Sequence, residues 1–159
     1  MTASTPRVRA AAVIGLGRLA EPAGSEAFFG LLRDPAPRVI LAAEKALIRL
    51  PWSFRHLAAA YGVTDSHVGR RALVRLASRL SGWDRVIFLI DALRDPAPSV
   101  QAHAMRSLRA VLFDARGWAF SKPSPTQRSE LEARLRFGAQ HFGGGLERQL
   151  RFVMRAIGG

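Results

Sequence analysis

The 159-residue chain contains no cysteine. This absence excludes a disulfide framework, a zinc site with cysteine ligands and a thiol nucleophile. No apolar run approaches the roughly 18 to 20 residues that a membrane-spanning helix needs. The length is that of one ordinary domain with its own core. We therefore expect a single domain over residues 1–159, without a membrane segment and located in the cytoplasm.

Acidic residues and lysine are also scarce. The chain has 24 Lys and Arg residues against 12 Asp and Glu, a formal net charge of +12, and only Lys45 and Lys122 are lysines. Such a charge attracts acidic or polyanionic partners over long range, and the arginine fork matches phosphate geometry. A genome-wide preference for arginine gives the same composition, so both explanations stay open at this stage.

The segment "VIGLGRLA" at positions 13–20 has the glycine spacing of a dinucleotide-binding loop. That chemistry needs a strand before the glycines and a helix after them, with the pyrophosphate at the helix N-terminus. Pro22 and Gly24 would interrupt the helix, and no alternation of strands and helices follows. No cofactor is therefore predicted, and Gly15 and Gly17 are assigned to a helix.

The chain is built from an internal repeat. The string "LRDPAP" occurs at 32–37 and 93–98 and leads into Val39 and Val100, and related segments end at Val8 and Val68, which gives spacings of 31, 29 and 32. A small residue follows each valine by four positions, a leucine by eight and, in three units, a branched apolar residue by eleven. These residues are Ala12, Ala43, Ala72 and Ala104; Leu16, Leu47, Leu76 and Leu108; and Leu19, Leu50 and Val111. Offsets of 0, 4, 8 and 11 predict one apolar stripe on a helix.

A second helix is predicted before each of the last three valines. Apolar or aromatic residues stand eleven and seven positions upstream of them: Phe28 and Leu32, Leu57 and Tyr61, and Leu89 and Leu93. Asp34 and Asp95 are expected to cap the next helix with a side-chain oxygen, and the prolines to end one helix and begin the next. Each unit is thus a helical pair.

The segments "VRAAAVIGLGRL" and "DPAPRVILAAEKALIRL" resemble HEAT repeats, in particular the short bacterial type of phycobilisome lyases. The resemblance covers Thr5 to about Phe113. It implies an all-α, right-handed α-solenoid of about four hairpins that binds proteins and occasionally nucleic acid. The expected repeats lie at about 5–33, 34–63, 64–94 and 95–142.

The C-terminal part departs from the repeat. A Pro/Ser loop is expected at 114–125, followed by a helix with Ser124 as N-cap, Pro125 at the first position and Gln127 completing a capping box. The glycines at 143–145 are expected to end that helix. A last amphipathic helix at 146–157 is predicted to cap the stack.

The first helix lacks a polar outer face, because almost nothing polar lies between Arg9 and Arg18. Terminal repeats of a solenoid normally show water a polar face. Three explanations are open. The chain is part of a longer array, this end packs on a partner or on a second copy, or the small Ala and Gly residues make the exposed surface only weakly apolar.

Catalytic and metal-binding residues are not predicted. The four histidines His56, His67, His103 and His141 lie in different units, and none forms an i, i+4 pair with another ligand. An enzyme such as a HEAT-like DNA glycosylase or a bilin lyase-type subunit stays a second alternative without a named residue.

The segment 57–80 also resembles a helix-turn-helix, with a turn at Gly62, a recognition helix beginning at 64–71, and His67 and Arg70 toward DNA. Arg71 stands where that motif has an apolar residue, whereas the repeat accounts for Val68. Arg71, Arg75 and Arg79 are spaced to form a basic ridge on one helix face. Carboxylates such as Glu44 or Asp84 could neutralise this ridge, or phosphates and acidic partners could bind it.

Five further residues are candidates for partner or nucleic-acid binding. Phe88 either protrudes into a groove or fills the core, and Trp118 either covers the helices or stacks on a partner. Arg148, Arg151 and Arg155 lie on the polar side of the last helix.

The sequence therefore predicts a non-enzymatic scaffold for protein–protein interaction, with an acidic partner surface favoured. The alternative is DNA binding through Arg70, Arg71, Arg75 and Arg79. The apolar first helix makes a homo-oligomer or a larger array a further option.

Overall fold

The fold is all-α. The computed structural model describes residues 5–19, 24–80, 82–113 and 122–158, and all regular elements among them are helices. The predicted all-α class is confirmed for these residues. The chain divides into two compact units, Met1–Arg79 and Leu80–Gly159, which are described separately below.

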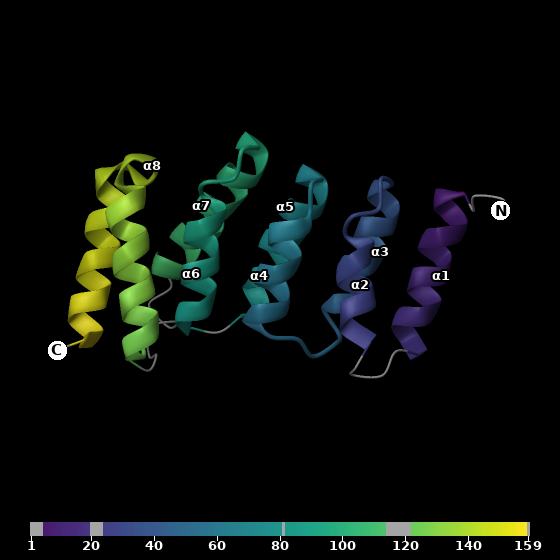
Figure 1. The fold of residues 1–159 in the computed structure, drawn as a ribbon, viewed down its shortest axis with the longest axis horizontal. Coiled ribbons are helices and arrows are strands. Elements are labelled where there is room, and N and C mark those ends of the chain that lie inside the picture. Colours follow the sequence, from purple (N-terminus) through teal and green to yellow (C-terminus); the bar gives the residue numbers. More distant parts are fainter. Residues whose placement is uncertain (1–4, 20–23, 81, 114–121, 159) are drawn as a thin grey trace. The chain divides into compact units, whose positions relative to one another are not determined.

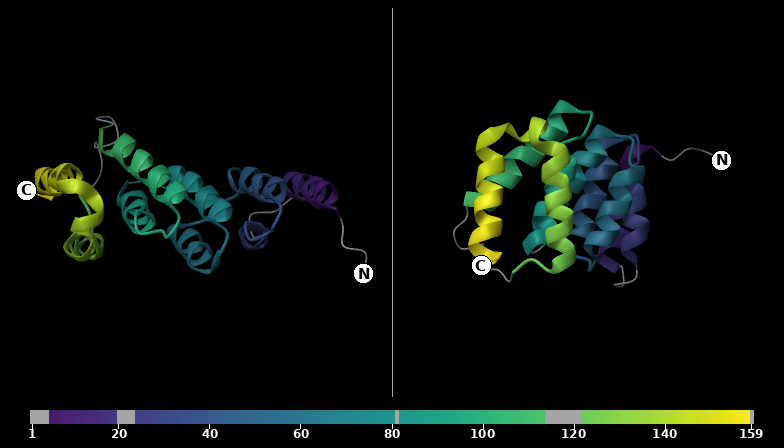
Figure 2. Two further views of the ribbon diagram at one scale, coloured as in Figure 1. Left: turned by 90° about the horizontal axis from the view of Figure 1, so that it is seen from above. Right: turned by 60° about the vertical axis from the view of Figure 1, so that its left-hand side comes forward.

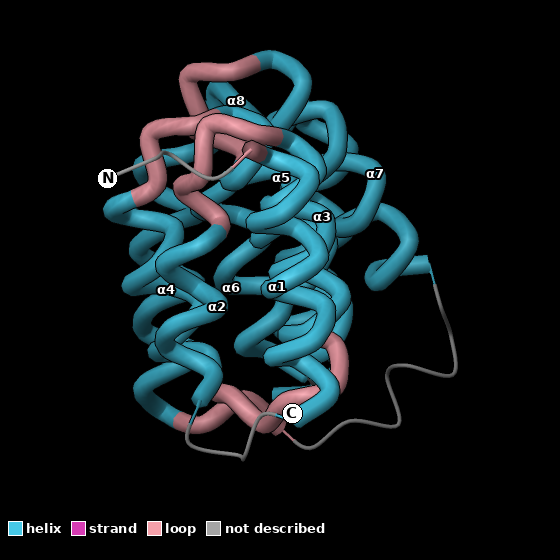
Figure 3. Tube along the Cα trace, turned by 90° about the vertical axis from the view of Figure 1, so that its right-hand side faces the viewer, coloured by secondary structure: helices cyan, strands magenta, loops and turns pink. Residues whose placement is uncertain are grey.

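Unit 1 consists of two layers of helices (Figures 1 and 3). Its elements are α1 (Pro6–Leu19), α2 (Ser25–Leu31), α3 (Pro37–Leu47), α4 (Phe54–Val63), α5 (His67–Leu76) and the short 3₁₀ helix η2 (Ala77–Arg79). In one layer α1 packs on α3 and α3 on α5. In the other layer α2 packs on α4, and α2 and α4 cover α3 and α5 respectively. The helical pairs expected within this unit are present.

The predicted apolar stripe is buried in most helices that follow an anchor valine. In α3, Val39, Ala43 and Leu47 are each 0% exposed. The equivalent residues of the later units are equally buried: Ala72, Leu76, Val100, Ala104 and Leu108. Burying such a stripe against a neighbouring helix is the main source of stability for this kind of packing.

In α1 the same stripe is exposed. Val8, Leu16 and Leu19 are 58%, 59% and 82% exposed, and Ala12 is also exposed. We call these four residues the α1 stripe. The reason is that the two helices have different packing partners. Helix α2 covers the equivalent stripe of α3, whereas no helix among the described residues covers the stripe of α1.

A different side of α1 faces α3. Val13 is 4% exposed, and a methyl group on Gly17 would come within 2.8 Å of Ala46 Cβ. Gly17 therefore allows two helices to approach closely, which is the role of a packing glycine rather than of a phosphate loop. Gly15 has open space around it.

The loop between α2 and α3 differs from the prediction in its capping. Ala36 is the N-cap of α3 and makes no side-chain cap, and Pro37 begins the helix. Asp34 Oδ1 instead accepts a hydrogen bond from the Ala36 amide at 2.8 Å, and both Asp34 oxygens accept from Arg9. Asp95 Oδ1 accepts from Ala97 in the same way. Because each aspartate stands three residues before the helix begins, at Pro37 or Pro98, its carboxylate closes the loop.

Unit 2 contains α6 (Gly82–Ala92), α7 (Pro98–Phe113) and α8 (Pro125–Gly158), and α6 packs on both α7 and α8. Gly82 has a φ of +53°, a conformation that favours glycine. Helix α6 is buried on nearly all sides, with residues Trp83, Val86, Ile87, Phe88, Leu89 and Ile90 at 3% exposure or less. It forms the core of the unit.

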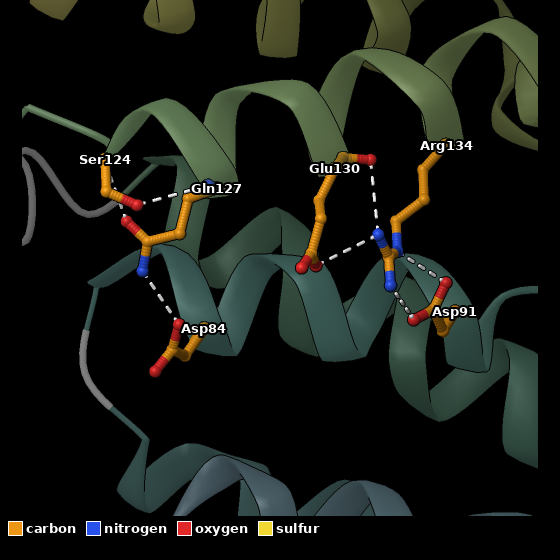
Figure 4. A network of polar contacts seen from close by, with 6 residues as sticks. All are labelled: Asp84, Asp91, Ser124, Gln127, Glu130 and Arg134. Carbon is orange, nitrogen blue, oxygen red and sulfur yellow. Dashed lines mark hydrogen bonds and ion pairs between the residues drawn. The ribbon is translucent and has the colours of Figure 1, made fainter.

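The beginning of α8 confirms the predicted cap. Gln127 N–H donates to Ser124 Oγ at 3.2 Å and the Ser124 amide donates to Gln127 Oε1 at 3.0 Å. Figure 4 shows how this end is tied to α6, through Gln127 to Asp84 and Arg134 to Asp91.

The predicted end of this helix at 143–145 is wrong, because helical structure continues through these glycines to Gly158. The ribbon nevertheless bends back within α8, so that its two arms lie side by side (Figures 1 and 2). Sharp helix bends commonly occur at glycine. Of the predicted loop at 114–125, residues 114–121 lie outside the described residues.

Candidate functional site

Five exposed basic residues gather on α1, on α3 and directly after the end of α3. Arg7 and Arg38 each precede the anchor valine of their unit by one position, and Arg18 and Arg49 follow it by ten. Since α1 and α3 pack side by side, this repetition places the arginines in two rows. Eleven helical residues span about 16 Å, so the rows stand roughly that far apart. Lys45 lies between them on α3.

Three large apolar side chains are exposed on the same side of these helices. Ile14, Leu41 and Ile48 are 47%, 49% and 51% exposed. On α3, Leu41 and Ile48 are nearly opposite Val39, which is buried against the second layer. We call this surface the outer face; its residues are Arg7, Ile14, Arg18, Arg38, Leu41, Lys45, Ile48 and Arg49.

The charge of the outer face is not neutralised within the two helices. Helix α1 has no acidic residue, and Glu44 is the acidic residue of α3. Glu44 is 6% exposed and lies on another side, where it pairs with Arg75. None of the five basic residues of the outer face forms an ion pair with another described residue.

Arg18 and Arg49 lie at the same end of the outer face. Together with Gly17 and Leu50 they line a shallow pocket where α1 and α3 end. Two arginines that line one hollow suit a carboxylate or another oxyanion, because a guanidinium presents a planar fork of donors.

Arginines of the predicted ridge bind other residues of unit 1. Arg75 Nε and Nη2 donate to the two Glu44 oxygens at 2.7 and 2.6 Å, and these hydrogen bonds hold the pKa of Arg75 above its usual value. Arg79 donates to the Leu47 carbonyl at 3.3 Å and lies over the Trp52 ring at 5.9 Å. Asp84, the other carboxylate considered for this ridge, accepts from Gln127 instead.

Arg70 donates to the carbonyls of Thr64 and Asp65 at 3.0 and 2.6 Å, whereas Arg71 is exposed. Three of the four predicted ridge residues therefore hold the unit together. Arg71 is the ridge residue that is exposed and forms no hydrogen bond or ion pair with another described residue.

The helix-turn-helix interpretation of this segment remains a prediction, because a helical pair is common to it and to the repeat, and His67 at the start of α5 is exposed. Helix α4 continues through Gly62 to Val63, and α5 begins at His67 with Ser66 as its N-cap. A recognition helix presents its N-terminal end to DNA. Here Gly69 is buried, and a methyl group there would collide with the Leu32 carbonyl oxygen. One side of the beginning of α5 therefore lies close to Leu32, the residue that follows α2.

The remaining candidate residues lie in unit 2. Phe88 is 3% exposed, so it fills the core rather than protruding. Arg148 and Arg151 are exposed on α8, and Arg151 pairs with Glu147 one turn earlier at 2.9 Å. Trp118 lies outside the described residues, as does the side chain of Arg155.

Sequence reasoning missed the outer face. Its signal is present in the sequence, because arginine recurs at the same two offsets in consecutive units, but the apolar offsets that define the repeat do not include these positions. Among the described residues no three His, Asp or Glu side chains are grouped to hold a metal ion. In the same part of the chain no helix combines the length and the apolar character needed to cross a membrane.

Comparison with known proteins gives no match: no family model, no curated protein and no solved structure is similar to the chain. The HEAT-repeat assignment remains a prediction from the sequence.

Proposed function

We propose that the chain is a cytoplasmic, HEAT-like α-solenoid scaffold that binds a protein partner with an acidic surface through the outer face of α1 and α3. The observation that carries this proposal is the combination of five uncompensated basic residues with three exposed apolar ones on one face. Protein interfaces typically have an apolar centre and a polar rim.

The apolar residues favour a protein over nucleic acid as the partner. Non-specific binding to DNA depends on phosphate contacts from Arg and Lys and gains little from exposed Ile and Leu side chains. A partner helix or loop with acidic residues around an apolar centre would use both parts of the outer face. Ile14, Leu41 and Ile48 would then be buried, and the arginines would pair with carboxylates.

DNA binding through the predicted ridge is the weaker candidate. Arg75 and Arg79 are held by Glu44 and by Leu47 and Trp52, so their binding to phosphates would cost these contacts. A metal-dependent enzyme has no supporting group of His, Asp or Glu residues among those that the structure describes.

The test is a binding titration with a fluorescent amphipathic peptide that carries Glu residues around a Leu/Phe centre. The double variant Arg38→Glu/Lys45→Glu should weaken binding at least about tenfold, since each reversal replaces attraction by repulsion. The matched control is Arg33→Glu/Arg55→Glu, which makes the same charge change at exposed residues of unit 1 outside the outer face.

Equal losses in both double variants would show a diffuse charge effect and overturn the proposal. The same variants are titrated with mixed-sequence duplex DNA. DNA binding that survives Arg38→Glu/Lys45→Glu but is abolished by Arg71→Glu would favour the nucleic-acid alternative.

A further inference from the structure

Two exposed apolar residues of the outer face, Leu41 and Ile48, lie beside the line along which α3 meets α5. Glu44 stands three positions after Leu41 and four before Ile48, so the three side chains follow one another along the helix. Ile48, the C-cap of α3, keeps a helical backbone with φ −60° and ψ −26°. Glu44 is buried and points to α5, because both its oxygens accept hydrogen bonds from Arg75. We call Leu41 and Ile48 the α3 seam.

One edge of the α3 seam is basic. Arg38 and Lys45 each precede a residue of the seam by three positions, so they form a parallel stripe on the same helix. Both are exposed, and neither forms an ion pair with another described residue.

The opposite edge is basic as well, through Arg71 of α5. Arg71 stands one turn before Arg75, the residue that binds Glu44, so both project from the side of α5 that faces α3. Arg71 follows the anchor valine of its unit by three positions and Leu41 follows its own by two, which places them at similar levels of the packed helices. Arg71 is exposed and forms no ion pair with another described residue. The α3 seam therefore has an open cation on each side.

The spacing of the α3 seam favours a helix as its occupant. Leu41 and Ile48 are seven positions apart, about 10 Å along α3. Residues seven apart also share one face of a partner helix, and two helices that cross at about 20° keep such residues in contact over several turns. In these pairs, an apolar seam with cations on both edges is matched by a seam with acidic residues on both edges.

The charges beside the α3 seam oppose a second copy of the chain as the occupant. Two seams packed on each other would bring Arg38, Lys45 and Arg71 of one chain close to the same residues of the other, and these like charges repel. An acidic helix buries the same apolar residues and is attracted by the same cations.

We propose that the partner of the outer face is an acidic amphipathic helix that lies along α3 on the α3 seam, and that Arg71 pairs with a carboxylate on the far edge of this helix. The partner helix has two large apolar residues seven positions apart, with Glu or Asp on both edges. This inference rests on the function proposed above, because it specifies the partner of the same face, and it extends that face to Arg71 of α5.

The first test compares two peptides of about 16 residues and identical composition, since shorter peptides hold little helix. In one, Leu residues seven positions apart are flanked by Glu on both edges of one helix face. In the other, the order is permuted so that Leu and Glu are spread around the helix. Fluorescence anisotropy with the full chain should show at least about tenfold tighter binding of the first peptide.

The second test concerns the edge formed by Arg71. Arg71→Glu should weaken binding of the first peptide about fivefold at low salt, because attraction is replaced by repulsion. Arg55→Glu is the matched control, with the same charge change at an exposed residue of α4 in the other layer, and should stay within about twofold of the wild type. Of two further peptides with Lys in place of Glu along one edge, one should bind Arg71→Glu more tightly than the wild type.

The third test concerns the α3 seam itself. Leu41→Ser/Ile48→Ser should weaken binding of the first peptide at least about tenfold, because the apolar area that binding buries is lost. Leu16→Ser/Leu19→Ser removes two exposed residues of the α1 stripe instead and should change the affinity by less than about twofold. Circular dichroism of each variant shows that the fold is kept.

Equal binding of the two peptides, equal effects of Arg71→Glu and Arg55→Glu, or a concentration-dependent dimer that Leu41→Ser/Ile48→Ser abolishes would overturn this inference. If both peptides bind equally but lose affinity in Arg38→Glu/Lys45→Glu and not in Arg33→Glu/Arg55→Glu, the function proposed for the outer face stands and only the helical partner is wrong. If neither peptide binds, both proposals are wrong.

Discussion

Arg75 of α5 and Glu44 of α3 form a two-point ion pair, Nε to Oε1 at 2.7 Å and Nη2 to Oε2 at 2.6 Å. The Glu44 side chain is 8% exposed and that of Arg75 is 34% exposed. The pair joins two neighbouring helices of one layer, and it removes both the buried carboxylate and one arginine from the charges available to a partner.

Because Glu44 is more buried than Arg75, replacing one residue of the pair should change the free energy of unfolding by a different amount from replacing the other. Arg75→Gln leaves a buried carboxylate and should lower the free energy of unfolding by about 2 kcal/mol or more. Glu44→Gln should cost less, because Arg75 can turn to water. Urea unfolding of both single variants and the double variant measures the coupling. A double variant as unstable as the sum of the singles would contradict a direct interaction.

The pair of Arg9 and Asp34 predicts a dependence of stability on pH. The hydrogen bonds from Arg9, together with the Ala36 amide, hold the pKa of Asp34 below its usual value. A lowered pKa in the folded state stabilises the fold above the unfolded value, and this stabilisation is lost as the pH falls below about 4.

Asp34→Asn should therefore reduce the loss of stability between neutral pH and pH 3, measured by urea unfolding at each pH. Asp65→Asn is the control, because that aspartate is exposed and its carboxylate has no ion pair among the described residues. If both variants respond to pH like the wild type, the Arg9 contact does not stabilise the fold.

Two glycines predict opposite effects of the same substitution. Gly69→Ala would push a methyl group into the Leu32 carbonyl and Thr64 Cγ2, and should destabilise unit 1 by about 2 to 3 kcal/mol. Gly15→Ala lies in a helix with open space and should stabilise it by about 0.5 to 1 kcal/mol. Thermal unfolding by circular dichroism distinguishes them, and a neutral Gly69→Ala would contradict the close contact of α5 with Leu32.

The contacts of Arg134 predict how firmly α8 is held. Its guanidinium donates to both Asp91 oxygens at 2.8 and 2.9 Å and to Glu130, and the Asp91 hydrogen bonds hold the pKa of Arg134 above its usual value (Figure 4). Arg134→Ala should speed hydrogen exchange in residues 125–136 while leaving α1 to α5 unchanged. Arg136→Ala, an exposed neighbour, is the control. Unchanged exchange in α8 would show that its apolar contacts hold it alone.

The sequence predicted the helices of unit 1 well because their apolar offsets and turn residues agree. Ser124 and Gln127 formed the predicted capping box for the same reason: both partners lie within one turn. The predicted helix end at 143–145 is not found, because helical structure continues to Gly158, although α8 bends back so that two helical arms lie side by side.

Burial was less predictable than helix formation. Leu16 and Leu47 occupy the same offset, yet one is 59% exposed and the other fully buried. The difference arises from which helix packs on each, and a single sequence does not contain this information. The outer face was missed because exposed positions carry no constraint from the core, so its arginines did not stand out among the other basic residues.

The most direct test of the proposed function is NMR titration of the ¹⁵N-labelled chain with the acidic amphipathic peptide. The account predicts that the largest shifts occur at Arg38, Leu41, Lys45 and Ile48 and disappear in Arg38→Glu/Lys45→Glu. Shifts centred on Arg71 and the end of α8, or none at saturating peptide, would contradict it.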